Sequence, residues 1–165
     1  MRPLMRNLLI VLAVIALFLW RGGFLATQVD DGLLRADGPD PCAHAERCVA
    51  VYLAPWCPQC RKSGALVQAL RDRAAATGGR LGVKVIVGRD EPAALEQYAR
   101  KLGGTVFFDD DGSFYRQLGA SGVPTWVSLD AQGNILERMA GRPHGASAEL
   151  LVHYLGEQLG VGDYL

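Results

Sequence analysis

The sequence has little that would indicate a nucleic-acid-binding protein, a disulfide-stapled miniprotein or a disordered chain. Its 17 basic and 17 acidic residues cancel, and there is no basic stripe that would attract nucleic acid. Four cysteines in 165 residues are too few for a disulfide scaffold. A hydrophobic fraction of 50% and a charged fraction of 21% exclude a wholly disordered chain. The length fits one globular domain with a short appendage.

One long apolar run stands near the N-terminus, flanked by arginines. It covers Leu8–Trp20 (LLIVLAVIALFLW), with Arg2 and Arg6 before it and Arg21 after it. As a helix this run spans roughly 20 Å, which is less than the roughly 30 Å of a bilayer core. The length alone is typical of a cleaved signal peptide.

The sequence after the run favours an uncleaved signal-anchor over residues 1–26. No small-x-small cleavage pattern is present, because bulky Phe24 stands two positions before Ala26. The preceding positive charges predict a single-pass protein of the bacterial inner membrane, with its domain in the periplasm. A cleaved signal peptide and a secreted domain are the alternative, and a buried helix in a cytosolic domain is disfavoured. Without the three arginines the chain carries 14 basic and 17 acidic residues, a net charge of −3.

The remaining sequence predicts a linker followed by one α/β domain. Residues 27–41 are rich in Asp, Gly and Pro, which is typical of a linker, and the domain covers residues 42–165. The order β-α-β-α-β-β-α predicts a mixed sheet with helices on both faces. The expected elements are strand Val49–Ala54, helix Pro58–Thr77, strand Leu81–Val87, helix Pro92–Leu102, strand Val106–Phe108, helical piece Phe114–Leu118, strands Thr125–Leu129 and Asn134–Met139, and helix Ala148–Leu159.

The motif Cys57-Pro58-Gln59-Cys60 stands where the first strand leads into the first helix. Free backbone N–H groups and the positive end of the helix dipole stabilise a thiolate at such a place. The two-residue spacing lets one thiol attack a disulfide and the other resolve the mixed disulfide that forms. Arg61 and Lys62 add positive charge nearby. A zinc site is disfavoured because the sequence has no second C-x-x-C, and we expect no bound metal.

Four further features have structural rather than catalytic interpretations. In an exported protein, Cys42 and Cys48 are expected to form a structural disulfide. A second redox pair that passes electrons to Cys57 and Cys60, or two free thiols, are the alternatives. We expect Trp126 to pack within its strand and the sequence Asp109–Asp111 to form a solvated turn rather than a calcium site. His144 and His153 are expected on the surface.

Three stretches together resemble the thioredoxin superfamily. They are Val51–Cys60 (VYLAPWCPQC), Gly122-Val123-Pro124-Thr125 and Val127–Gly133 (VSLDAQG), within a similarity that covers residues 48–159. The exported or membrane-anchored bacterial TlpA-like thiol–disulfide oxidoreductases are the most similar branch. The resemblance implies a thioredoxin-like fold, with the predicted hydrophobic helix in front of it.

The resemblance also implies the roles of the site residues. Cys57 would be the nucleophile and Cys60 the resolving thiol. Val123–Pro124 would be a cis peptide bond beside the disulfide, in a loop that offers backbone groups to a bound client. The residues expected to shape the site are Trp56, Pro58, Gln59, Val123, Pro124 and Thr125.

Two departures from the family pattern bear on the redox direction. Val51 occupies the position, six residues before the nucleophile, where thioredoxins carry a buried acid. The Pro58-Gln59 dipeptide is closer to the more oxidising DsbA-like and glutaredoxin-like members. We expect a reductase that acts on exported protein thiols and disulfides, is recycled by a membrane redox partner and needs no cofactor. A DsbA-like oxidase is the alternative. A metal chaperone or assembly factor, which would bind a soft ion such as Cu(I), is a second alternative.

Overall fold

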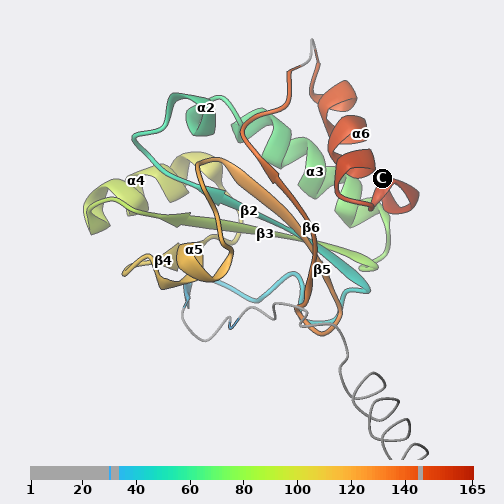
Figure 1. The fold of residues 1–165 in the computed structure, drawn as a ribbon, viewed down its shortest axis with the longest axis horizontal. Coiled ribbons are helices and arrows are strands. Elements are labelled where there is room, and N and C mark those ends of the chain that lie inside the picture. Colours follow the sequence, from blue (N-terminus) through green and yellow to red (C-terminus); the bar gives the residue numbers. More distant parts are fainter. Residues whose placement is uncertain (1–29, 31–33, 145–146) are drawn as a thin grey trace, which may run out of the picture.

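The computed structural model describes residue 30 and residues 34–144 and 147–165 (Figure 1). The signal segment expected over residues 1–26, including the apolar run Leu8–Trp20, lies outside the described residues. Within the part that is described, no helix is both long and apolar enough to cross a membrane.

A mixed six-stranded sheet forms the centre of the molecule, with the strand order β1-β4-β3-β2-β5-β6. β2, β3 and β4 are parallel, whereas β1, β5 and β6 pair antiparallel with their neighbours. The strands are β1 (Arg35–Ala36), β2 (Arg47–Leu53), β3 (Leu81–Gly88), β4 (Phe107–Asp109), β5 (Thr125–Asp130) and β6 (Ile135–Ala140). The helices are α2 (Pro58–Arg61), α3 (Gly64–Ala76), α4 (Pro92–Leu102), α5 (Ser113–Gln117) and α6 (Ala148–Gln158), followed by the 3-10 turn η2 (Gly162–Tyr164).

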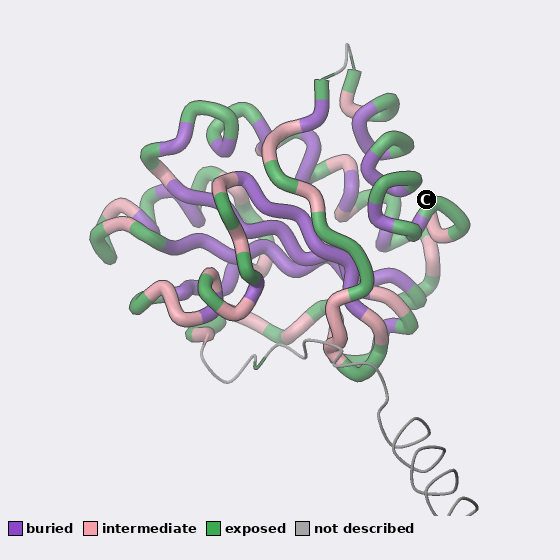
Figure 2. The backbone as a smooth tube through the Cα atoms, viewed as in Figure 1, coloured by how far each residue is buried: buried purple, intermediate pink, exposed green. Residues whose placement is uncertain are grey.

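The central strands bury both of their faces, as Figure 2 shows by their purple colour. All eight residues of β3 are buried, which explains why its sequence is an almost continuous apolar run. Alternate residues of β2 enter two different cores. Val51 and Leu53 belong to the core that includes residues of α3, α4 and α6, whereas Ala50 and Tyr52 pack with residues of α5. The predicted mixed sheet with helices on both faces is therefore confirmed.

The prediction of one continuous helix over Pro58–Thr77 was wrong, because the chain forms two helices there. The buried Ser63 hydroxyl donates a hydrogen bond to the Gln59 carbonyl at 2.9 Å, and the Ser63 N–H donates to the Cys60 carbonyl at 3.0 Å. These bonds close a tight turn before Gly64, where α3 begins. The apolar spacing runs through the break, so the sequence pattern does not reveal it. The break leaves α2 as a single turn that contains Cys60 and has Cys57 as its N-cap.

The prediction that Asp109–Asp111 forms a solvated turn was wrong for Asp109. Asp109 is fully buried, and its carboxylate accepts hydrogen bonds from the Tyr52 hydroxyl at 2.8 Å, the Phe114 N–H at 3.1 Å and the Tyr115 N–H at 2.9 Å. Asp109 therefore joins β2, β4 and the start of α5. Gly88 lies against the same hydroxyl, where an added methyl group would collide with Tyr52.

Candidate active site

Cys57 lies at the junction of β2 and α2 and forms the N-cap of that helix. Its sulfur accepts a hydrogen bond from the Cys60 N–H at 3.2 Å, with Pro58 at the first helical position. The Cys57 thiol in turn donates to the Val123 carbonyl, with 3.4 Å between sulfur and oxygen. The helix thus presents an N–H group to this sulfur, which is the arrangement that stabilises a thiolate.

Cys60 lies deeper than Cys57 and is fully buried. Burial raises the pKa of the Cys60 thiol to about 12, and the hydrogen bond with Cys57 contributes in the same direction. Both cysteines are free thiols in this structure. The pair is therefore asymmetric, because Cys60 holds its proton throughout the physiological range.

This asymmetry predicts the pH behaviour of the reduced protein. At pH 7 the thiolate fraction of Cys60 is about a thousandfold lower than that of an ordinary cysteine, so iodoacetamide should modify Cys57 and leave Cys60 unmodified. Stability should fall as pH rises from 9 towards 12, since the unfolded chain releases this proton first. Urea unfolding of the reduced protein at a series of pH values measures this fall. Cys60→Ala should remove the part between pH 9 and 10, whereas Tyr52 and Tyr98, whose pKa values are also raised, still lower stability above pH 10. Rapid alkylation of Cys60 at pH 7 would contradict the prediction.

The Val123–Pro124 peptide bond is cis, the isomer that the resemblance implied. Two hydrogen bonds hold the loop around it. The Thr125 hydroxyl donates to the Gly122 carbonyl at 2.6 Å, and the Gly141 N–H donates to the Pro124 carbonyl at 2.7 Å. The loop therefore brings the predicted residues Val123, Pro124 and Thr125 to the redox motif, although they lie about 65 residues away in the sequence.

Trp56 is 54% exposed beside Cys57, and its indole N–H donates to the Arg89 carbonyl at 2.9 Å. Arg89 adopts a left-handed conformation with φ of 63°, and its guanidinium stacks on the Tyr115 ring at 4.3 Å. Sequence reasoning missed Arg89. The one feature of the sequence that could have indicated Arg89 is its position directly after β3. The parallel strands β2 and β3 end at the same edge of the sheet, so Arg89 lies at the edge where the redox motif begins.

Tyr98 on α4 is a second group that sequence reasoning missed. Among the described residues its buried hydroxyl has no hydrogen-bond partner. Desolvation raises the pKa of Tyr98, and the charges of Cys60 and Cys57 raise it further. Val51, six residues before Cys57, is fully buried. The spacing of Leu95, Tyr98 and Ala99 along α4 could have placed Tyr98 on the helix face that meets the core.

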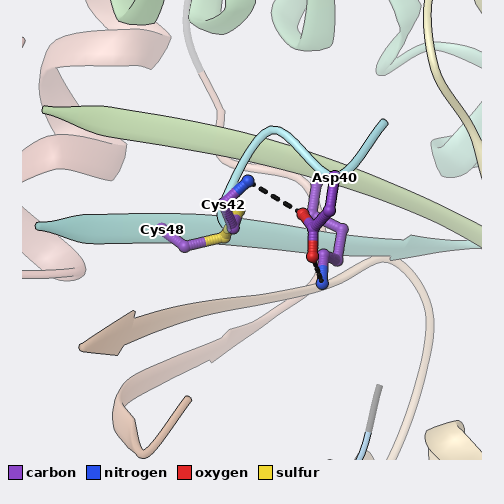
Figure 3. Close-up of a disulfide and its surroundings, with 4 residues drawn as sticks. Asp40, Cys42 and Cys48 are labelled. Carbon is purple, nitrogen blue, oxygen red and sulfur yellow. Dashed lines mark hydrogen bonds and ion pairs between the residues drawn. A yellow bond between two sulfur atoms is a disulfide. The ribbon is translucent and has the colours of Figure 1, made fainter. Parts of the chain in front are cut away.

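The second cysteine pair forms a disulfide between Cys42 and Cys48, shown in Figure 3. The Asp40 carboxylate accepts from the Cys42 N–H at 2.8 Å and also lies 2.8 Å from the buried Lys84 ammonium. Cys48 stands at the start of β2, whereas Cys57 follows its end. At roughly 3.3 Å per residue the strand separates the two pairs by more than about 15 Å. This geometry favours a structural disulfide over electron transfer between the pairs within one chain.

Replacing both Cys42 and Cys48 with serine separates these two roles. The double variant should lose about 2 kcal/mol of unfolding free energy, the contribution expected for so short a closed loop. The rate of exchange at Cys57 should stay unchanged, because the disulfide lies at the far end of β2. Urea unfolding and a disulfide-reduction assay measure the two quantities. A large fall in exchange rate without loss of stability would instead indicate a redox relay.

The other predicted structural residues lie where they were expected. Trp126 is fully buried within β5, and its indole N–H donates to the Gly141 carbonyl at 3.0 Å. His144 and His153 are exposed, and His153 lies 3.4 Å from Glu157. Within the described ranges, no group of three or more His, Cys, Asp or Glu side chains is placed to hold a metal ion.

No family model matches the sequence, and no curated protein sequence matches it. Solved structures do match the fold. A secreted Mycobacterium tuberculosis disulfide oxidoreductase homologous to E. coli DsbE aligns with a TM-score of 0.53 and 22% identity, over 68% of this chain and 81% of that one. StoA from Bacillus subtilis gives a TM-score of 0.51 and 20% identity, over 67% and 83%.

A third match is the exposed lipoprotein thioredoxin of Streptococcus pneumoniae, with a TM-score of 0.55 and 18% identity, over 70% of this chain and 87% of that one. The chain has a thioredoxin-like fold. The thioredoxin-like fold predicted from the resemblance is thereby confirmed. Two of these structural neighbours are described as a disulfide oxidoreductase and a thioredoxin. In this thioredoxin-like domain, the Cys57 and Cys60 pair follows the central strand β2.

Proposed function

We propose that the protein is a thiol–disulfide oxidoreductase that reduces disulfides of exported proteins through Cys57 and Cys60. One observation carries the proposal. The Cys57 sulfur accepts the Cys60 N–H bond at the start of α2, while the Cys60 thiol is buried and protonated one helical turn away. One sulfur is thus prepared to attack and the other is held in reserve within reach of it.

The reaction balances as two successive exchanges. The Cys57 thiolate attacks a client disulfide, one client sulfur leaves as a thiolate and takes up a proton, and a mixed disulfide forms. Cys60 then gives its proton to solvent and attacks the Cys57 sulfur. The second client sulfur leaves, and Cys57 and Cys60 are joined as a disulfide. Two electrons have passed to the client, so an external dithiol donor must reduce the pair again. We assign that task to a membrane redox partner.

The side chains around the pair fit the proposed docking of a client chain. Trp56 is exposed on one side of Cys57, and Gln59 is exposed within the motif. The Val123 carbonyl points at the Cys57 sulfur from the proline loop. A client whose cysteine reaches Cys57 would meet these three groups first.

The proposed place of action is the outer face of the bacterial inner membrane. Two of the structural neighbours are described as secreted and as an exposed lipoprotein. The apolar run Leu8–Trp20 with its preceding arginines supports a signal-anchor. On this proposal residues 27–41 lead from the anchor to the domain, and residue pairing at β1 attaches part of that segment to β4.

The reduction potential of the Cys57 and Cys60 pair tests the direction of the reaction. A value near −270 mV, with reduction of insulin disulfides by the prereduced protein, supports the reductase. A value near −120 mV, with rapid oxidation of a reduced client, would replace it by the oxidase that the Pro58-Gln59 dipeptide favours. Tight stoichiometric Cu(I) binding without exchange activity would reject both in favour of a metal chaperone.

A further inference from the structure

A hollow of about 570 Å³ lies directly beside the redox motif. It is lined by Gln59 from α2, by Met139 from β6, by Arg142 and His144 after β6, and by Tyr154 on α6. Figure 1 shows that α2, the end of β6 and the start of α6 lie at the same end of the molecule. Because Gln59 stands between Cys57 and Cys60, a chain whose cysteine reaches Cys57 passes close to this hollow.

The backbone before Arg142 is held firmly against the proline loop. The Gly141 N–H donates to the Pro124 carbonyl at 2.7 Å, and the Gly141 carbonyl accepts from the Trp126 indole N–H at 3.0 Å. Trp126 is fully buried, so it fixes Gly141 to the core. The position of Arg142 relative to Cys57 is therefore set by the same loop that contacts the Cys57 sulfur.

The Arg142 guanidinium has unused hydrogen-bonding capacity. Its Nε donor is shielded from solvent and has no hydrogen-bond partner among the described residues. Its one recorded bond is a long one, from NH1 to the Pro143 carbonyl at 3.4 Å. Because Nε is shielded, a group that enters the hollow would meet the terminal NH1 and NH2 groups of Arg142. A guanidinium pairs best with a carboxylate, which can accept a hydrogen bond from each of these two groups.

The hollow provides no anion of its own. None of the described residues that line it is acidic, so Arg142 meets no carboxylate among them. The complementary charge must come from another molecule. Tyr154, 43% exposed, adds an aromatic wall that can pack against the methylene groups of a long acidic side chain.

We propose that this hollow binds an acidic side chain of the client protein, and that Arg142 makes the protein select clients with an aspartate or glutamate near the reactive cysteine. This inference rests on the proposed function, because it names the class of client for the same site. Arg142 contacts the client but takes no part in the transfer of electrons. It therefore affects which disulfides are reduced, not the chemistry of their reduction.

Two disulfide-bonded peptides test the inference. They are identical except for a glutamate or a glutamine two residues from the cysteine. The wild-type protein should reduce the glutamate peptide with a kcat/KM about tenfold higher, the effect expected of one charge-assisted hydrogen bond. Arg142→Gln should bring this ratio to about one while leaving the rate for the glutamine peptide unchanged. Arg142→Glu should reverse the preference in favour of a lysine peptide.

Lys62→Gln is the matched control, since it removes an equal charge close to Cys60 but outside the hollow. This control should keep the tenfold ratio. Equal rates for both peptides in the wild type, or an equal loss of selectivity in Lys62→Gln, would overturn the inference. Absence of turnover with either peptide would instead overturn the proposed function. Urea unfolding of each variant verifies that the fold is retained.

Discussion

Replacing Cys57 with serine is expected to reduce thiol–disulfide exchange to the rate of a protein-free control. The hydroxyl of serine is not ionised at neutral pH and cannot form the mixed disulfide. Cys60 cannot take over the attack, because it is fully buried and burial raises its pKa to about 12. Insulin reduction and oxidation of a reduced peptide should both stop in this variant.

Replacing Cys60 with serine should have a different effect, so the two variants together distinguish the attacking thiol from the resolving thiol. Cys57 can still attack, but no second thiol remains to release the client, so a covalent complex should accumulate. Mass spectrometry of that complex identifies the client and maps the bond to Cys57. The Cys42→Ser/Cys48→Ser variant is the control and should keep full exchange activity. An adduct on Cys42, or exchange activity retained by Cys57→Ser, would reject the assignment.

Much of the architecture could be predicted because its determinants are local in the sequence. The apolar runs of β2 and β3 reflect strands buried on both faces. The motif between β2 and α2 was correctly predicted to lie at the start of a helix, since Pro58 suits the first helical position. A sequence pattern predicts a structural feature well when the residues that make up the pattern are also the residues that form the feature.

The features that escaped prediction depend on partners distant in the sequence or on single side-chain bonds. β1 is only two residues long and exists because Arg35 and Ala36 pair with β4. The break before α3 depends on one bond from Ser63 to the Gln59 carbonyl. Arg89 matters to the site because its carbonyl receives the Trp56 indole N–H from 33 residues away. None of these contacts leaves a periodic pattern in the sequence.

Asp109 shows why a turn-like composition can mislead. The run Asp109–Gly112 has the composition of a solvated turn, and Asp110 and Asp111 are indeed exposed. Asp109 differs because β4 is parallel to β3 and next to it, which brings its carboxylate to the Tyr52 hydroxyl 57 residues earlier in the chain. Burial raises the pKa of Tyr52, with the Asp109 hydrogen bond as the second cause, so this phenol donates at every physiological pH.

Asp109→Ala should therefore cause a large loss of stability. It would leave three donors without an acceptor: the buried Tyr52 hydroxyl, the buried Phe114 N–H and the part-buried Tyr115 N–H. At about 1–3 kcal/mol for each, the free energy of unfolding should fall by roughly 3–9 kcal/mol. Asp109→Asn should cost less, because its remaining carbonyl oxygen can still accept from part of this set.

A double-mutant cycle with Tyr52→Phe makes this prediction specific. Tyr52→Phe alone should lower the unfolding free energy by about 1–2 kcal/mol, and much less when Asp109 is already alanine, because the hydrogen bond that it removes is then absent. Urea unfolding measures all four proteins. Asp110→Ala is the control: Asp110 pairs only with the half-exposed Arg35 among the contacts recorded for its side chain, so its loss should cost under about 1 kcal/mol. Additive effects of the two core substitutions would show that Asp109 is held by its backbone contacts to α5 and not by Tyr52.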